Sequence, residues 1–466
     1  MKDMWNHFLL YKGDMETTSF FLSQMEQALL ELGKEVYAFS FHEVKEVEKQ
    51  NITELLLFCM KWKKRLEKEE SISSCDKRKK LPILSFNFAG VFGEDKLTTA
   101  NICWDKKEEL ETFLQENYPD LYVSDENKLL IDVLDLYYVN IVVDHPYHYH
   151  IHLANRPKNY AQICIDKNHV NYMKRFFGEI DTLGFLPSGG TKLTQKEKGQ
   201  QSEKRYDVVF TGTYMCPECF DVFIERNGQE YADFYRKMLR EVLEGEHVLL
   251  EDVVEKCLYE EIPEMTFLEL KETLGHIMFL DYYIRFYRRQ WVIRTLVDAG
   301  IKVHCFGGGW ETFSCEKPEN LIYETESGEE ISLAKALEVS ERMRQEKQYK
   351  SKYLTSIECL ERIHAAKISL NILPGFEDGG HDRIYNTMLN EAVCVSDENQ
   401  FLMKQLKDQK EIVFYKLFDE KSLIQGVQKV LLDEEYREKL KKDAYEMANN
   451  GHTWKKRVEN LIDMLQ

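Results

Sequence analysis

Hydrophobic positions in the first 41 residues change from one periodicity to another. A short apolar run at residues 7–11 is followed by a Gly-Asp turn, and apolar side chains then recur near helical spacing over 17–32. Gly33 has the position of a helix C-cap, and a second apolar run begins at 36–41. This pattern predicts a β-α-β unit, and therefore a parallel sheet.

The strand pattern recurs through the first 190 residues. Short apolar runs, separated by polar or helical stretches, predict further strands at residues 81–88, 138–144, 161–165 and 182–186. Such alternation of strands and helices is typical of a doubly wound α/β domain.

A stretch without apolar side chains divides the chain. Residues 194–205 read TQKEKGQQSEKR, which cannot enter a core and is therefore predicted to be a linker. A second α/β pattern follows, with strands predicted at 206–213, 301–306, 367–373 and 392–396 and helices at 355–366 and 382–389. Helical periodicity over about 217–299 interrupts this alternation. The second half is therefore predicted to be Rossmann-like as well.

Composition and charge exclude several classes of protein. The 81 acidic and 62 basic residues give a formal charge of −19, which repels phosphodiester backbones and anionic membrane surfaces. The most apolar stretch, residues 136–143, is far shorter than the roughly 20 residues of a membrane helix. We therefore expect neither nucleic-acid binding nor integral membrane contact. The N-terminus lacks the pattern of a signal peptide, and the 11 scattered cysteines suit reduced thiols, so a cytoplasmic location is expected.

One loop in the second half has the pattern of a phosphate site. The strand predicted at 367–373 runs into a loop that contains Gly379 and Gly380, and the next helix opens with Asp382 as its expected N-cap. Free N–H groups at a helix N-terminus attract anions, and Arg383 in the first turn can donate two parallel hydrogen bonds to phosphate oxygens. The alternative is an ordinary glycine turn beside a surface arginine.

A carboxylate and four histidines follow a predicted central strand of the first half. Asp144 and His145 would lie at its carboxyl end, where ligands bind in open α/β folds, which favours acceptor-side or catalytic roles. A structural cap is the alternative. A zinc site formed by His148, His150 and His152 fits less well, because their alternate spacing matches neither a helical pair nor a closed four-ligand site.

Segments of both halves resemble one family, the CgeB-like (spore-maturation-protein type) glycosyltransferases. The donor-binding half of that family is similar to AKISLNILP (366–374), HDRIYNTMLN (381–390) and CVSD (394–397). Its N-terminal half resembles NIVVDHP (140–146), CIDKNHV (164–170) and FLPSGGT (185–191), and its C-terminal helix resembles TWKKR (453–457). The segments follow one another in the expected order.

The resemblance implies the GT-B architecture, in which two Rossmann-like α/β domains face an interdomain cleft. We accordingly predict an N-terminal domain at 1–193, a linker at 194–205, a C-terminal domain at 206–452 with a helical insertion at about 217–285, and a helix at 453–466 that packs back on the first domain. The implied activity is transfer of a sugar, expected to be a hexose, from a nucleoside-diphosphate sugar to a glycan, protein or small-molecule acceptor. Neither a metal nor another cofactor is expected, because a helix dipole and an arginine supply the charge.

Site residues follow from the resemblance by position. The implied donor-binding set is Gly212, Thr213, Gly379, Gly380, His381, Arg383 and Asn386. Asn386 stands where wider GT-B families usually have a ribose-binding glutamate, and Glu391 stands where this family usually has glycine. These departures keep open the alternative of a GT-B scaffold without turnover. The rival enzyme class is a nucleotide-sugar epimerase of the same architecture.

Overall fold

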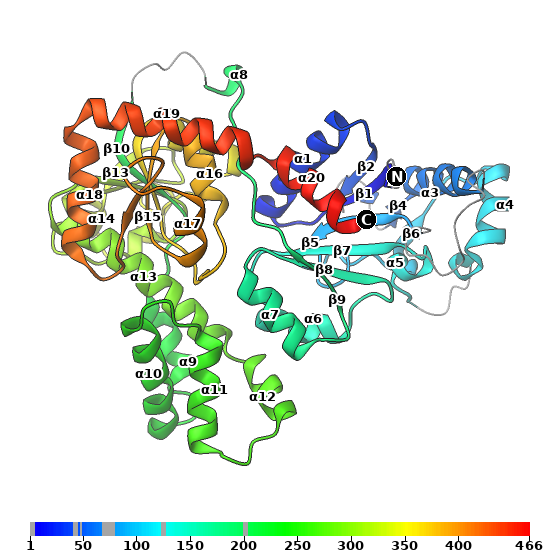
Figure 1. The fold of residues 1–466 in the computed structure, drawn as a ribbon, viewed down its shortest axis with the longest axis horizontal. Coiled ribbons are helices and arrows are strands. Elements are labelled where there is room, and N and C mark those ends of the chain that lie inside the picture. The colour runs from blue at the N-terminus through cyan, green and yellow to red at the C-terminus, as the bar shows by residue number, and fades with distance from the viewer. Residues whose placement is uncertain (1–4, 41–44, 47–48, 68–79, 123–126, 199–203) are drawn as a thin grey trace. The chain divides into compact units, whose positions relative to one another are not determined.

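The chain folds into two compact units. The structure is a computed structural model that describes residues 5–40, 45–46, 49–67, 80–122, 127–198 and 204–466 (Figure 1). Unit 1 comprises Met1–Leu186 together with Trp454–Gln466, and unit 2 comprises Pro187–Thr453. The chain thus leaves unit 1 once and returns to it for its last residues.

Unit 1 is built on a six-stranded parallel sheet of order β2-β1-β5-β7-β8-β9. Its strands are β1 (His7–Lys12), β2 (Glu35–Ser40), β5 (Pro82–Phe86), β7 (Tyr137–Val142), β8 (Tyr160–Cys164) and β9 (Asp181–Phe185). The central strands are buried along their whole length, as expected of a parallel sheet covered on both faces. The sequential order of the strands reverses between β1 and β5, and ligands bind near such a point in open α/β sheets.

Helices cover this sheet, and the last one belongs to the same unit. They are α1 (Glu16–Glu31), α3 (Thr53–Leu66), α4 (Glu108–Asn117), α5 (Leu130–Val133), α6 (His150–Ala154), α7 (Lys167–Phe176) and α20 (Trp454–Leu465). Helices α1 and α20 lie side by side (Figure 1), with the rings of Phe21 and Trp454 5.0 Å apart. The indole N–H of Trp5 donates to the carbonyl of Leu465 at 2.9 Å. A small separate sheet consists of β3 (Lys45–Glu46), β4 (Lys49–Asn51) and β6 (Ile102–Cys103).

Unit 2 carries a seven-stranded sheet of order β13-β12-β11-β10-β14-β15-β16. Only β13 runs antiparallel to its neighbour. The strands are β10 (Tyr206–Thr211), β11 (Val303–Phe306), β12 (Leu321–Glu324), β13 (Glu330–Ser332), β14 (Ala366–Asn371), β15 (Val393–Asp397) and β16 (Val413–Tyr415). The six parallel strands have the dinucleotide-binding order 3-2-1-4-5-6, so the order reverses between β10 and β14.

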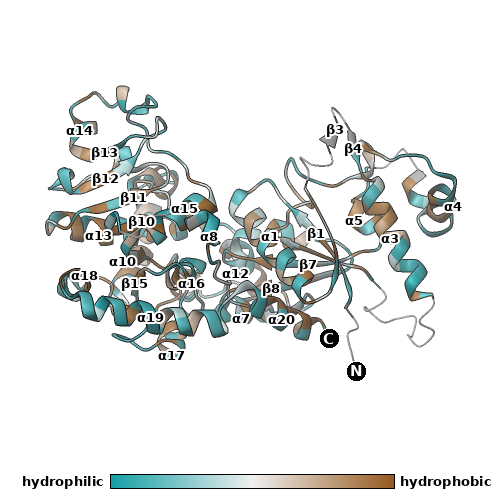
Figure 2. Ribbon diagram, turned by 90° about the horizontal axis from the view of Figure 1, so that it is seen from above, coloured by the Kyte–Doolittle hydropathy of each residue, from teal (hydrophilic) through white to brown (hydrophobic). Residues whose placement is uncertain are grey.

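The helices of unit 2 fall into two groups. Those around the sheet are α8 (Gln195–Lys198), α13 (Met278–Asp298), α14 (Leu333–Leu337), α15 (Ser356–His364), α16 (Asp382–Leu389), α17 (Gln400–Gln405), α18 (Glu420–Leu432) and α19 (Glu434–Gly451). The others form an insertion between β10 and β11, which stands away from the sheet in Figure 1: α9 (Asp221–Ile224), α10 (Gln229–Glu244), α11 (Leu250–Glu261) and α12 (Phe267–Leu274). Figure 2 shows α18 and α19 largely hydrophilic on their outward faces.

The predicted fold class, an α/β protein with two Rossmann-like domains, is confirmed for each unit taken by itself. The boundary between the units differs from the predicted linker at 194–205, because residues 187–193 already bond to unit 2. The N–H of Gly190, for example, donates to the carbonyl of His452 at 2.8 Å. Of the predicted linker, residues 199–203 lie outside the described residues. No described helix is both long and apolar enough to cross a membrane.

Glu391, whose place in the sequence pattern is unexplained, follows the C-terminus of α16 in a left-handed backbone conformation. Its φ is +63°, directly after the C-cap residue Asn390. Helices commonly end with glycine in this conformation, because a Cβ then approaches the backbone too closely. The glycine found here in the resembling family suits this left-handed backbone conformation. Glu391 adopts the same conformation at a cost in strain.

Replacing Glu391 by glycine should stabilise unit 2. Relief of the left-handed strain, roughly 1–2 kcal/mol, exceeds the added freedom of the unfolded chain, about 0.4–1 kcal/mol. We expect Glu391→Gly to raise the melting temperature by about 1–3 °C in differential scanning calorimetry. Glu391→Ala is the control, since it removes the carboxylate but keeps the Cβ. An increase for alanine as large as for glycine would contradict the backbone explanation.

Candidate functional site

A tight turn follows β10 at the point where the strand order of unit 2 reverses. The N–H of Gly212 donates to the carbonyl of Phe306 at 2.7 Å, and the N–H of Tyr214 donates to the carbonyl of Gly308 at 2.8 Å. A Cβ on Gly307 would lie 2.6 Å from the Gly212 carbonyl oxygen, so only glycine fits there. The turn is therefore fixed by a second turn that packs directly against it.

The guanidinium of Arg383 anchors the end of β10. Its Nε donates to the carbonyl oxygen of Thr211 at 3.0 Å, and Nη1 donates to Oδ1 of Asn371 at 3.2 Å. The guanidinium also lies 5.0 Å from the centre of the Phe210 ring. A Cβ on Gly212 would meet Nη2 at 3.4 Å, and Nη2 makes no hydrogen bond to any described residue. Nη2 thus keeps both of its N–H groups for a ligand, and the two parallel hydrogen bonds to a phosphate stay a prediction.

A second arginine reaches the same turn from α13. Nη1 of Arg289 donates to the carbonyl of Thr213, and its guanidinium lies 5.2 Å from the centre of the Phe210 ring. Burial, together with the charge of Arg383, lowers the pKa of Arg289 to about 9. Burial likewise lowers the pKa of Arg383. Two buried positive charges therefore lie at one turn, and their mutual repulsion disfavours the protonated state of both side chains.

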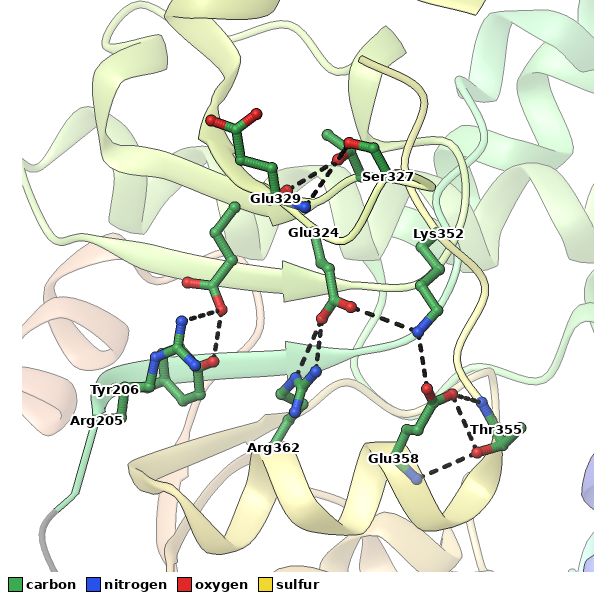
Figure 3. Close-up of polar contacts among 11 residues, drawn as sticks. Arg205, Tyr206, Glu324, Ser327, Glu329, Lys352, Thr355, Glu358 and Arg362 are labelled. Carbon is green, nitrogen blue, oxygen red and sulfur yellow. Dashed lines mark hydrogen bonds and ion pairs between the residues drawn. The ribbon is translucent and has the colours of Figure 1, made fainter. Parts of the chain in front are cut away.

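Other buried or half-buried arginines of this unit have carboxylate partners. Arg362 donates to Oε2 of Glu324 from Nε at 3.2 Å and from Nη2 at 2.8 Å, and Lys352 joins the same network (Figure 3). Burial opposes the charge on Arg362, but the bonds to Glu324 raise its pKa above the ordinary value. Within the described chain, by contrast, no carboxylate lies at ion-pair distance from Arg289 or Arg383. An anionic ligand would supply the missing charge.

The loop before α16 differs in detail from the prediction. The N-cap is His381, whose Nδ1 accepts the N–H of Arg383 at 3.1 Å, and not Asp382, whose carboxylate instead accepts the side-chain amide of Asn386 at 2.8 Å. Gly380 packs so closely on a ring that a Cβ would lie 3.1 Å from Phe401, and the carbonyl of Gly379 accepts the amide of Asn399. Packing thus restricts a side chain at Gly380, the carbonyl of Gly379 is bonded to Asn399, and the contact of either glycine with a phosphate stays a prediction.

Both polar atoms of the Asn386 side chain form hydrogen bonds within the protein. Its Oδ1 accepts the backbone N–H of Thr191 at 2.7 Å, while its Nδ2 donates to Asp382. Asn390, one turn later, accepts the N–H of Leu193 at 2.9 Å and donates to the carbonyl of Thr191 at 2.8 Å. The two amides hold residues 191–193 against α16, which supports a structural role for Asn386 over the ribose contact.

In unit 1, Asp144 follows β7 and is held in place by two polar side chains. Its Oδ2 accepts the amide of Asn87 at 3.3 Å and the hydroxyl of Tyr149 at 3.2 Å. Asn87 itself has a φ of +48°, and Phe88 after it has a φ of +63°, so two non-glycine residues in sequence adopt the left-handed conformation. Such strain is found at functional sites when the surrounding structure enforces it. Asp144 is thus a half-buried, positioned carboxylate.

His145, in contrast, lies within an aromatic cluster. Its Nδ1 accepts the N–H of Tyr147 at 3.2 Å, and its ring stacks on Tyr147 at 3.7 Å between centroids. The rings of His169 and Tyr172 lie at 4.4 Å and 4.8 Å. These contacts favour the structural cap over the catalytic role for His145. Throughout the described ranges, no three potential metal-ligating side chains come together, including His148, His150 and His152.

The sequence analysis missed Arg289. Its neighbourhood is a 21-residue helix rich in tyrosine, phenylalanine and arginine, which reads as core packing. The helix does pack as core, but Arg289 is buried toward β10 without a carboxylate. An arginine on the apolar stripe of a helix, with no acidic residue three or four positions away on that stripe, is the sequence signal that could have revealed it.

Comparisons with solved structures find similar chains at 10% identity or less. Solved structures similar to the chain include sucrose-phosphate synthase from Thermosynechococcus elongatus, at 10% identity, TM-score 0.44 and coverage of 98% of this chain and 97% of that one. Another is HepE from Anabaena, solved with UDP and glucose, at 8% identity, TM-score 0.42 and 99% of each chain. An α-glucosyltransferase solved with UDP and DNA has 10% identity, TM-score 0.47 and 98% of each chain. No curated protein matches the sequence.

A family model matches part of unit 2 and the final helix. The model, described as "Glycosyl transferase-like", covers residues 288–463, which is less than half of the chain. The matched part includes both Arg289 and Arg383, as well as the loop and helix between β14 and β15. Residues 288–463 are therefore similar to glycosyltransferases, and they contain the two buried arginines that lack carboxylate partners.

Proposed function

We propose that the protein transfers a sugar, a hexose in our expectation, from a nucleoside-diphosphate sugar to an acceptor. One observation carries this proposal: Arg289 and Arg383 place two buried guanidinium groups, without a carboxylate, at the strand-order reversal of a Rossmann-like sheet. A diphosphate has the charge to neutralise both groups, and this edge of the sheet is where nucleotides bind in such folds. The match of residues 288–463 to a glycosyltransferase-like model supports the choice of reaction.

In this proposal the diphosphate lies against the Gly212–Thr213 turn. Nη2 of Arg383 and the backbone N–H of Thr213, which bonds to no described residue, are the donors left there. As the bond between sugar and diphosphate breaks, negative charge grows on the leaving diphosphate. Preorganised guanidinium groups in a water-poor site stabilise that charge without reorganisation. Asp144 is the proposed acceptor-side group, because its neighbours fix its carboxylate at the end of β7.

Donor binding should be lost when Arg289 is made neutral. Arg289→Met removes a buried charge that has no carboxylate partner, so the protein without ligand should keep or gain stability. UDP, GDP or TDP sugars should lose their stabilising effect on the variant. A donor present at 100 times its Kd stabilises the wild type by about 2.7 kcal/mol in a thermal-shift screen. In the variant we expect that shift to fall by at least half.

Arg362→Met is the matched control for this substitution. It also removes an arginine of unit 2, one that is half-buried, but it deprives the carboxylate of Glu324 of a partner, at a cost of about 2 kcal/mol. We expect lower stability with an unchanged donor affinity. The opposite pattern, with donor affinity lost in Arg362→Met and retained in Arg289→Met, would refute the proposed diphosphate site.

Asp144→Asn should separate donor binding from transfer. The amide keeps the size and one acceptor oxygen but loses the charge, so donor affinity should hold while turnover falls about 100-fold or more. A purely structural cap would instead lower the melting temperature and leave the turnover of the folded protein unchanged. Melting temperature, donor affinity and product formation, measured on one preparation, distinguish the two results. Wild-type turnover in a folded Asp144→Asn protein would remove Asp144 from the proposed mechanism.

Chelation tests the proposed source of positive charge. If Arg289 and Arg383 stabilise the leaving diphosphate, transfer should persist in excess EDTA with less than a two-fold change in kcat. A loss of turnover that Mg²⁺ or Mn²⁺ restores would instead assign that charge to a divalent ion.

A further inference from the structure

A Cys-Pro-Glu-Cys segment, residues 216–219, follows the turn of the proposed diphosphate site but forms no part of that site. It leads into the short 3-10 helix η5 (Pro217–Phe220), in which Pro217 and Phe220 are buried. The ring of Phe220 stacks on the ring of Phe286 in α13, with 6.1 Å between centroids. Packing on α13 therefore fixes the backbone that carries both cysteines.

The two cysteines are the first and last residues of one tight turn. The N–H of Cys219 donates to the carbonyl of Cys216 at 3.0 Å, and Pro217 fixes the backbone between them. A 3-10 turn brings side chains three positions apart into line, with Cα atoms about 6 Å apart. Disulfides form at Cα separations of about 4.4–6.8 Å. The backbone therefore already permits a disulfide between the two cysteines.

The two thiols differ in their access to solvent. Both are free in the structure, and Cys219 is the only exposed cysteine among the described residues, whereas Cys216 is half-buried. Burial, together with a hydrogen bond to Glu218, raises the pKa of Cys216 to about 11. The thiolate is the form of cysteine that attacks a disulfide. Cys219 is therefore the thiol that reacts first with a reagent from solution, and Cys216 is the one that follows.

The proton of Cys216 has an acceptor within the same turn. Sγ of Cys216 donates to Oε2 of Glu218 at 2.6 Å, and Glu218 is exposed, so it can pass a proton on to water. A carboxylate in this position can act as a general base while the sulfur attacks. Bound zinc is a poorer explanation of the two thiols, because no group of three potential metal-ligating side chains occurs among the described residues, this segment included.

We propose that Cys216 and Cys219 form a reversible disulfide by exchange with a low-molecular-weight disulfide. The thiolate of Cys219 attacks one sulfur of that disulfide, which gives a mixed disulfide and releases one thiolate. Sγ of Cys216 then attacks Sγ of Cys219 while its proton passes to Glu218, and the second thiolate leaves. Two protein thiols are thereby oxidised, the external disulfide is reduced, and its two thiolates take up the two protons that the cysteines lose. The proposal does not depend on the proposed transfer reaction.

Mass spectrometry of a single tryptic peptide tests the proposal. Residues 206–226 contain no internal lysine or arginine, and Cys216 and Cys219 are their only cysteines. The reduced full-length protein is incubated with oxidised glutathione at pH 8, quenched with N-ethylmaleimide in denaturant and digested. The dithiol then carries two maleimides, a mixed disulfide carries one maleimide and one glutathione, and the internal disulfide carries neither. We expect the internal disulfide to predominate, and dithiothreitol added before the quench to restore the dithiol.

Serine substitutions test the order in which the two thiols react. In Cys216→Ser a glutathione adduct should persist on Cys219, because no second thiol displaces it. In Cys219→Ser the adduct on Cys216 should form at least about 10-fold more slowly than that, because less thiolate is present. Cys103→Ser is the matched control, since it removes a half-buried cysteine of unit 1 and should leave the oxidation of the 206–226 peptide unchanged.

Glu218→Gln tests the proton acceptor through the pH dependence of closure. In stopped flow with dithiobis(nitrobenzoate), an aromatic disulfide, the second release of thionitrobenzoate reports closure of the internal disulfide. An ionised Glu218 takes the proton directly, so wild-type closure should change less than about 3-fold between pH 6.5 and 7.5. In Glu218→Gln the thiol must first lose its proton to solvent, so closure should rise about 10-fold. Equal slopes in the two proteins would contradict the role of Glu218.

Two results would overturn the disulfide itself. One is a wild-type 206–226 peptide that retains two maleimides in a large excess of oxidised glutathione. The other is a glutathione adduct on wild-type Cys219 that persists as long as in Cys216→Ser. The first result is read on the unaltered sequence, so it decides the matter even if a serine variant fails to fold. Because no sugar nucleotide is present, a failure here leaves the proposed diphosphate site untouched.

Discussion

The charge on two buried guanidinium groups is the constraint on which the second unit depends most. Arg289 and Arg383 both lie over the ring of Phe210 and donate to carbonyl groups of one turn. Among the described residues they have a π face and backbone oxygens but no carboxylate at ion-pair distance, so their charge is only partly compensated. Where an arginine serves the fold alone, as at Arg362, a carboxylate accompanies it. This difference, within one sheet, distinguishes the proposed diphosphate site from a structural ion pair.

The position of this site depends on residues far away in the sequence. Arg383 begins α16, and the same helix is held further along by the amides of Asn386 and Asn390, which bind the backbone at Thr191 and Leu193. The glycine turn after β11 fixes the other side of the site by its close approach to Gly212. Glycines and side-chain amides therefore position the turn after β10 and helix α16, and these elements in turn position the two guanidinium groups.

The sequence predicted the elements well and the individual contacts less well. The long strands β1, β5, β7, β10 and β14 appeared as apolar runs because they are buried on both faces. Strands of three or four residues, such as β12 and β16, are too short for any periodicity. The place of Arg383 after a glycine loop indicates a phosphate contact, which stays a prediction. The partner of Asn386 lies 195 residues away and has no local signal, because the contact depends on tertiary packing. The burial of Arg289 has one local signal, an arginine on the apolar stripe of α13 with no acidic residue three or four positions away.

The discontinuity of unit 1 affects the order in which the chain can fold. Its strands are made first, but α20, which packs on α1 and accepts the Trp5 indole N–H at Leu465, is made last. During synthesis, unit 2 is complete in sequence while the face of α1 that α20 covers is still exposed to solvent. The first unit to be translated is therefore the last to close, and a ribosome that stalls before Trp454 would release a protein with an intact second sheet and an open first one.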